Sequence, residues 1–162
     1  MEIVDPARRL LRHALATVAY RGGKAIREVP DGFADFQLGD RGTRTPAAIL
    51  AHIGDLFDWG LSLARGEARW RNSTPLAWDN EVDRFFTSLK AFDDYLASEA
   101  PLGETVEKLF QGPVADALNH VGQLAMLRRL AGWPVRGENY FKATIETGRV
   151  GADQAKPRVE FA

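Results

Sequence analysis

The sequence predicts an all-α protein, an antiparallel four-helix bundle that forms one domain over residues 1–162. Apolar residues recur at helical spacing in four long segments, and no segment shows the two-residue alternation that is typical of a β-strand. The chain has no internal repeat, and glycines and prolines stand near the ends of these segments. With 162 residues and 45% hydrophobic content, the chain is long enough to bury one sizeable core.

The first helix is predicted over about residues 5–28. Asp5 is a helix-capping residue, and Pro6 suits the first helical turn because its fixed φ matches that of a helix. Gly22 and Gly23 each weaken a helix by roughly 1 kcal/mol relative to alanine, so we expect a bend or a close approach there. The apolar residues that define this helix are Leu11, Leu15, Val18 and Ile26.

A long loop rich in glycine and aspartate, residues 29–44, separates the first helix from the second. Thr45 and Pro46 open the second helix in the same way as the first, and Gly66 closes a helix predicted over about residues 46–65. Its helically spaced residues are Ile49, Ile53, Leu56, Gly60 and Leu63.

The third helix, predicted over about residues 76–98, has the clearest amphipathic pattern in the chain. Pro101 and Gly103 end this pattern, and a short amphipathic turn is expected at residues 104–110. The apolar positions of the third helix follow one another in steps of three and four: Trp78, Val82, Phe85, Leu89, Phe92 and Leu96.

The fourth helix is predicted over about residues 113–131, because Pro113 is a start signal and Gly132 a stop signal. The tail that follows, residues 133–162, is rich in glycine and charge, and we expect it to be irregular with at most a short strand or turn. The loop lengths fit one or two crossover connections between helices.

Composition excludes several classes of function. The net charge of -1 provides no field that would hold a nucleic acid, and the absence of cysteine excludes disulfides, thiolate-ligated zinc and a thiol nucleophile in the protein. The N-terminal segment has no apolar run after a basic stretch, and no window approaches 18 uninterrupted apolar residues. We therefore expect a soluble cytoplasmic protein that contacts neither nucleic acid nor membrane.

Three polar residues stand out against this apolar pattern. Asp116 and His120 are four residues apart on one face of the fourth helix, and His52 lies in the apolar stripe of the second. Burying an unpaired carboxylate or imidazole in the core of the bundle is unfavourable, so the three side chains point to a metal site. Two imidazoles and a carboxylate suit zinc, nickel, manganese or iron, and they leave coordination positions open for water or substrate.

Structural roles for the same residues stay open at this stage. Asp116 could complement the dipole of its helix, and the two histidines could be hydrogen-bonded core residues. Gln123, one turn beyond His120, could donate a hydrogen bond to a metal ligand or cap a neighbouring helix. The tryptophans, Trp70 among them, could form the wall of a ligand pocket, although those at helical spacing such as Trp59 are more often core residues.

Two segments carry a resemblance to a known family. TPAAILAHIGDLFDWGLSLARGE in the second helix and DALNHVGQLAMLRRLAGWPV in the fourth resemble the DinB-like superfamily of four-helix bundles. In that family a histidine of helix two and a histidine pair of helix four typically hold a divalent metal, and His52 and His120 match two of these positions. Asp116 replaces the third histidine, as in the related thiol-dependent isomerase branch, and a carboxylate shifts the preference toward harder cations.

The resemblance implies a metal-dependent enzyme that acts on a small molecule. Its relatives include S-transferases and isomerases that use a low-molecular-weight thiol such as bacillithiol or mycothiol, and a related hydrolase is a further possibility. A thiol supplied from outside also agrees with the missing cysteine. The alternative is a non-catalytic binding or stress-response module in which the polar trio is structural or vestigial. A homodimer is expected in either case, because bundles of this size often pair through exposed apolar helix faces.

Overall fold

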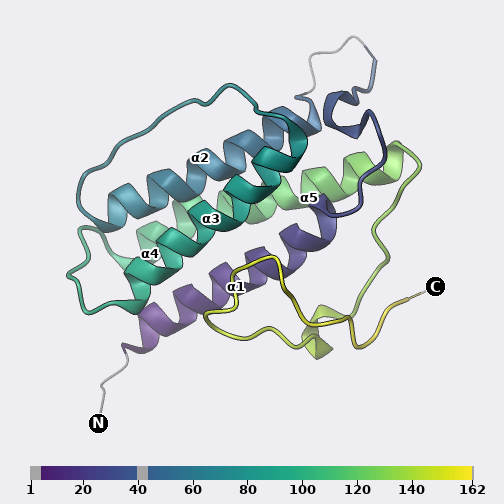
Figure 1. Ribbon diagram of the computed structural model, residues 1–162. Helices are drawn as coiled ribbons and strands as arrows, with labels where there is room; N and C mark the ends of the chain where they lie inside the picture. The colour runs from purple at the N-terminus through teal and green to yellow at the C-terminus, as the bar shows by residue number, and fades with distance from the viewer. Residues whose placement is uncertain (1–4, 40–43, 162) are drawn as a thin grey trace.

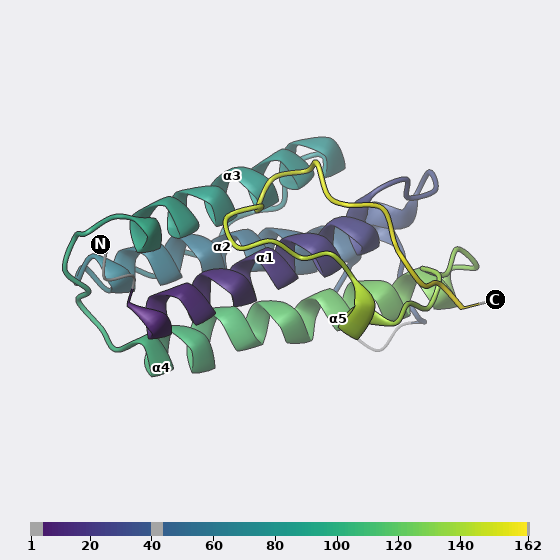
Figure 2. The same ribbon diagram turned by 90° about the horizontal axis from the view of Figure 1, so that it is seen from below.

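Helices account for nearly all the regular structure in the computed structural model, which describes residues 5–39 and 44–161. Within these ranges the only β-type pairing is an isolated bridge between Glu138 and Glu160. The predicted all-α fold is therefore confirmed. The long helices pack side by side (Figures 1 and 2) and are α1 (Pro6–Ile26), α2 (Pro46–Ala64), α3 (Trp78–Ala97) and α5 (Ala115–Leu130), the last preceded by α4 (Val106–Leu109).

The ends of α1, α2 and α3 lie within two residues of their predicted positions. The side chain of Asp5 accepts a hydrogen bond from the backbone N–H of Ala7, and that of Thr45 accepts one from the N–H of Ala48. These contacts satisfy backbone donors that have no partner inside the helix. The capping signals in the sequence are therefore confirmed by hydrogen bonds.

The predicted start of the fourth helix is wrong. A π-helical turn, η2 (Phe110–Val114), joins α4 to α5, so that one helical run continues through the position of Pro113. Proline has no N–H and its ring displaces the carbonyl of the preceding turn, and a wider turn accommodates both defects without ending the helix. Asp116 consequently has helix on both sides and is not next to a free helix N-terminus.

The predicted antiparallel arrangement is also wrong for α2 and α3, which run parallel. Gly54 of α2 lies against Arg84 of α3, and Gly60, further along α2, lies against Phe92, further along α3. The connection at residues 65–77 must therefore return along the bundle before α3 begins. This is the kind of crossover that the loop lengths predicted, and Figure 1 shows it passing beside α2.

The other helix pairs follow from the contacts of α1. Arg12 pairs with Asp93 near the end of α3, and Gly22 lies against Phe85 nearer its start, so α1 and α3 are antiparallel. Arg128 of α5 donates hydrogen bonds to carbonyls at the C-terminal end of α1, which makes α1 and α5 parallel. The described helices thus run up, down, down and up, with α5 packed against both α1 and α2.

The predicted close approach at Gly22 is present. A Cβ atom at this position would lie 2.5 Å from Cζ of Phe85, a ring that is fully buried in the core. Gly22→Ala should therefore lower the free energy of unfolding by about 1–3 kcal/mol. Urea denaturation checks this result. Gly122→Ala in α5 is the matched control, because nothing lies within 4 Å of its Cβ position and alanine there should stabilise the helix by up to about 1 kcal/mol.

The tail beyond α5 is irregular, as predicted, with one short 3-10 turn, η3 (Tyr140–Lys142). It packs along α1, where Glu138 accepts hydrogen bonds from Tyr20 at 2.5 Å and from Lys24 at 2.9 Å. The tail thus covers the α1 side of the bundle (Figure 2). No helix among the described residues is long and apolar enough to cross a membrane.

Candidate metal centre

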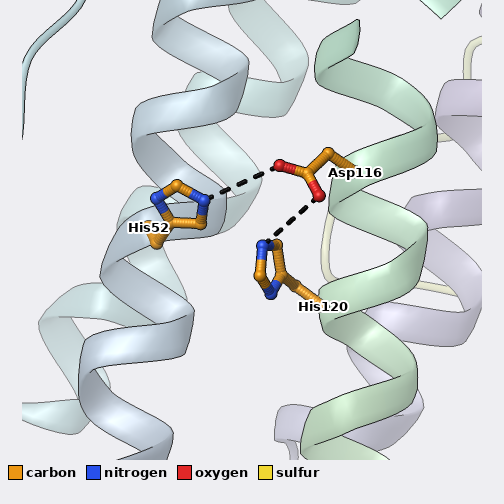
Figure 3. A group of neighbouring side chains, drawn as sticks. All are labelled: His52, Asp116 and His120. Carbon is orange, nitrogen blue, oxygen red and sulfur yellow. Dashed lines mark ion pairs between the residues drawn. The ribbon is translucent and has the colours of Figure 1, made fainter. Parts of the chain in front are cut away.

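The three predicted metal ligands meet at the seam between α2 and α5 (Figure 3). Asp116 lies between the two imidazoles: one carboxylate oxygen is 3.8 Å from Nε2 of His52 and the other is 3.5 Å from Nε2 of His120. All three side chains offer a ligand atom within 4.8 Å of the others. The antiparallel packing of α2 on α5 and the one-turn spacing on α5 produce this arrangement.

The spacing fits a divalent cation. Bonds of about 2.0–2.2 Å to nitrogen and oxygen place tetrahedral ligands about 3.4 Å apart, close to the observed 3.5 and 3.8 Å. The imidazole rings of His52 and His120 are 4.7 Å apart between centroids, and their planes are nearly perpendicular. The two distances involve different oxygens of Asp116, and both are close to the separation expected around one ion.

The sequence predicted that the three side chains would be buried in the core of the bundle, and the structure shows that they are not. The side chains of His52, Asp116 and His120 are 19%, 45% and 12% exposed. The core stripe of α5 includes Ala117, Val121 and Leu124, and Asp116 and His120 flank it. This position explains how polar residues are tolerated without an ion, and it gives a bound ion access to solvent and substrate.

Gln123 fixes the orientation of His120. Its side-chain oxygen lies 2.7 Å from Nδ1 of the imidazole, where it accepts the ring N–H. The lone pair of Nε2 is then available on the side of Asp116. Metal-binding histidines commonly donate their second ring N–H to an oxygen in this way. The contact found is thus with a candidate ligand, and not with the end of a neighbouring helix.

His52 is held from the opposite side by the crossover segment. Trp70 packs edge-on against its ring at 5.6 Å between centroids, and Trp59 of α2 packs against Trp70 at the same distance. Trp59 is half-buried, so it contributes both to the core and to the wall of the site. Trp70 therefore lies in the wall of the site, which is one of the alternatives that the sequence left open for the tryptophans.

The lowered pKa of His52 favours the neutral imidazole that metal binding requires. Desolvation lowers its pKa below the usual value, and the electrostatic interactions with His120 and Arg44 act in the same direction. The negative charges of Asp116 and Asp55 oppose this shift without reversing it. The imidazole of His52 is therefore neutral at pH 7 and can donate its lone pair to a metal.

A second polar cluster anchors the crossover segment beside His52. This cluster was not predicted from the sequence. The buried carboxylate of Asp55 accepts hydrogen bonds from the backbone N–H and the hydroxyl of Ser73 at 2.8 and 2.6 Å. Arg84 of α3 pairs with Asp55 at 2.5 Å and with Asp58 at 3.0 Å. These contacts tie α2, α3 and the segment that carries Trp70 into one unit.

Asp55 should make the stability of the fold sensitive to acid. Burial raises its pKa, but the hydrogen bonds from Ser73 and the charge of Arg84 outweigh this effect and hold the pKa below 3.8. Because the folded-state pKa is depressed, this stabilisation is present above about pH 4 and is lost as the pH falls further. Asp55→Asn should cost about 1–3 kcal/mol at pH 7.

Urea denaturation at several pH values between about 2 and 7 measures this effect. The free energy of unfolding should fall less steeply with acid in the Asp55→Asn variant than in the wild type. Asp94→Asn is the control, because Asp94 pairs with Lys90 on the exposed surface of α3. Equal acid dependence in the wild type and in Asp55→Asn would contradict the role assigned to Asp55.

Comparisons of the chain with family models, with curated proteins and with solved structures found no match. The resemblance to the DinB-like superfamily therefore stays a prediction that rests on the two helical segments quoted above. The fold itself brings together a His52, Asp116 and His120 group that could hold a metal ion.

Proposed function

We propose that the protein is a divalent-metal-dependent enzyme of the DinB-like class, with His52, Asp116 and His120 as the metal ligands. The observation that carries this proposal is the convergence of three ligand atoms within 4.8 Å from two helices. Zinc, nickel, manganese and iron all accept such a ligand set. Three protein ligands leave at least one coordination position open, as in catalytic metal sites.

The reaction that we propose is the transfer of a low-molecular-weight thiol to an electrophile. A bound divalent cation with an open position would favour the thiolate form of a coordinating thiol. The thiol proton passes to solvent, the sulfur forms a bond to an electrophilic carbon, and a leaving group departs from that carbon with the bonding electrons. The chain supplies the ligands and the apolar surroundings, and Gln123 positions His120.

A thiol-conjugation assay tests this activity. The zinc-loaded protein is incubated with bacillithiol or mycothiol and a panel of alkyl and aryl halides, and the S-conjugates are quantified by mass spectrometry. Conjugation should require both metal and protein, and it should be lost in His52→Ala. Conjugation by His52→Ala at the wild-type rate would contradict the proposal, and a protein that binds no metal would favour a non-catalytic binding module.

Gln123 provides a more selective test of the proposed ligand set. Gln123→Ala removes the acceptor of the His120 N–H, so the affinity for zinc should fall about tenfold. Gln123→Glu retains an oxygen at this position and should keep the affinity of the wild type or increase it. Calorimetric titration with zinc measures both variants. Equal affinities in the wild type and Gln123→Ala would show that this contact does not support metal binding.

A further inference from the structure

We infer that the groove next to the candidate metal centre binds an amphipathic small molecule, with its apolar body along α5 and its carboxylate paired with Arg44. This inference deepens the proposed function and rests on it, because it names the class of the electrophile. It concerns Arg44 and the apolar side chains of the groove, none of which is a candidate metal ligand.

The groove has a volume of about 540 Å³ and includes His52 and His120 of the candidate metal centre in its wall. His52, His120 and Gln123 form one part of its wall. A pocket of this size lies within the range of roughly 300–1,000 Å³ that is usual for small-molecule sites. Apart from these polar groups and Arg44, the wall consists of apolar side chains, namely Leu38, Ile49, Met126, Leu127 and Leu130.

Three of these apolar side chains are unusually accessible. Leu38, Met126 and Leu130 are 43%, 53% and 48% exposed, although all three are large hydrophobic residues. Single exposed apolar residues are common on protein surfaces, but a group that lines one groove indicates a binding site. Their contact with an apolar ligand would remove this surface from water. The groove therefore favours a substrate with a hydrocarbon body.

Arg44 determines the charge of the other end of the ligand. It is exposed, lines the groove together with His52, and forms no ion pair with any residue in the described ranges 5–39 and 44–161. It also immediately precedes Thr45, which caps the N-terminal end of α2, where the helix dipole adds positive potential. Among the described residues that line the groove, Arg44 supplies the one guanidinium, which suits a single carboxylate.

Octanoate is the probe for this groove, and octanol is its neutral counterpart. Calorimetric titration of the wild type should show tighter binding of octanoate by about threefold to fivefold, as expected for one solvent-accessible ion pair. Arg44→Gln should remove this difference. Arg9→Gln is the matched control, because Arg9 is an exposed arginine on α1, away from the groove.

The apolar wall is tested with Leu130→Asp, which should weaken octanoate binding by more than about tenfold. Leu10→Asp is the control, because Leu10 is 70% exposed and lines a different apolar groove, beside α4. If the probe binds only in the groove at α5, Leu10→Asp will bind it like the wild type. Circular dichroism confirms that each variant is folded.

Several results would overturn the inference: no binding of octanoate, equal binding of octanol and octanoate, or loss of binding in Leu10→Asp instead of Leu130→Asp. The octanol comparison needs only the wild type, so the test does not depend on a variant that folds. The zinc content of the same samples tests the proposed function separately. Zinc binding without octanoate binding overturns this inference alone, whereas octanoate binding without zinc overturns the role of the groove as a substrate site of a metal enzyme.

Discussion

Replacing His120 with alanine should weaken zinc binding by more than about 100-fold while the bundle stays folded. The imidazole is one of the three candidate ligands among the described residues, and its loss leaves one imidazole and one carboxylate to hold the ion. The side chain lies at the edge of the α2 and α5 seam and not in the core, so its removal should change the free energy of unfolding by less than about 1 kcal/mol.

Calorimetric titration with zinc measures the affinity, and urea denaturation without metal measures the stability. His13→Ala is the matched control: His13 lies on α1, its Nδ1 is 3.3 Å from the hydroxyl of Thr147, and it does not belong to the candidate metal group. This variant should bind zinc as the wild type does. If His120→Ala kept the affinity of the wild type, His120 would not be a ligand.

The largest loss of stability should come from Phe85→Ala. The ring is fully buried, packs against Phe57 at 5.3 Å and Phe86 at 5.0 Å between centroids, and fills the space next to Gly22. Its removal leaves a cavity between α1, α2 and α3, and we expect a loss of about 3–5 kcal/mol in the free energy of unfolding.

Phe141→Ala is the control for this substitution, because the side chain of Phe141 is 96% exposed. Its effect should stay within about 0.5 kcal/mol. Urea denaturation of both variants and the wild type at pH 7 provides the comparison. A loss below about 1 kcal/mol for Phe85→Ala would show that the ring does not fill the core as described.

The parts of the fold that depend on local chemistry could be predicted from the sequence. Asp5 and Thr45 mark the starts of α1 and α2 because a capping side chain bonds to a backbone N–H only a few residues away. The apolar steps of three and four identify α3 for a similar reason. Pro113 was misleading, because whether a proline ends a helix or sits in a π-helical turn depends on the packing around it.

Helix direction and loop contacts could not be predicted. The sequence does not state that residues 65–77 return along α2, and this path makes α2 and α3 parallel. Trp70 and Ser73 lie on that path, and they reach His52 and Asp55 only through the tertiary fold. Contacts of this kind leave no periodic signal in the sequence.

For the candidate site, the sequence predicted the residues but not their environment. The spacing of Asp116 and His120 showed that they share one side of a helix, and the apolar pattern placed His52 on a facing one. The period of 3.6 residues could not determine whether that side faces the centre of the bundle or its edge. The identity of the metal, the use of a low-molecular-weight thiol and the formation of a homodimer stay predictions.

Elemental analysis of the protein purified without a metal-affinity tag tests the central claim most directly. We predict about one equivalent of zinc, nickel, manganese or iron per chain in the wild type, and loss of that metal in both His52→Ala and His120→Ala. A wild-type protein that holds no metal after incubation with these ions and dialysis would contradict the claim, and the chain would then be better described as a helical binding module.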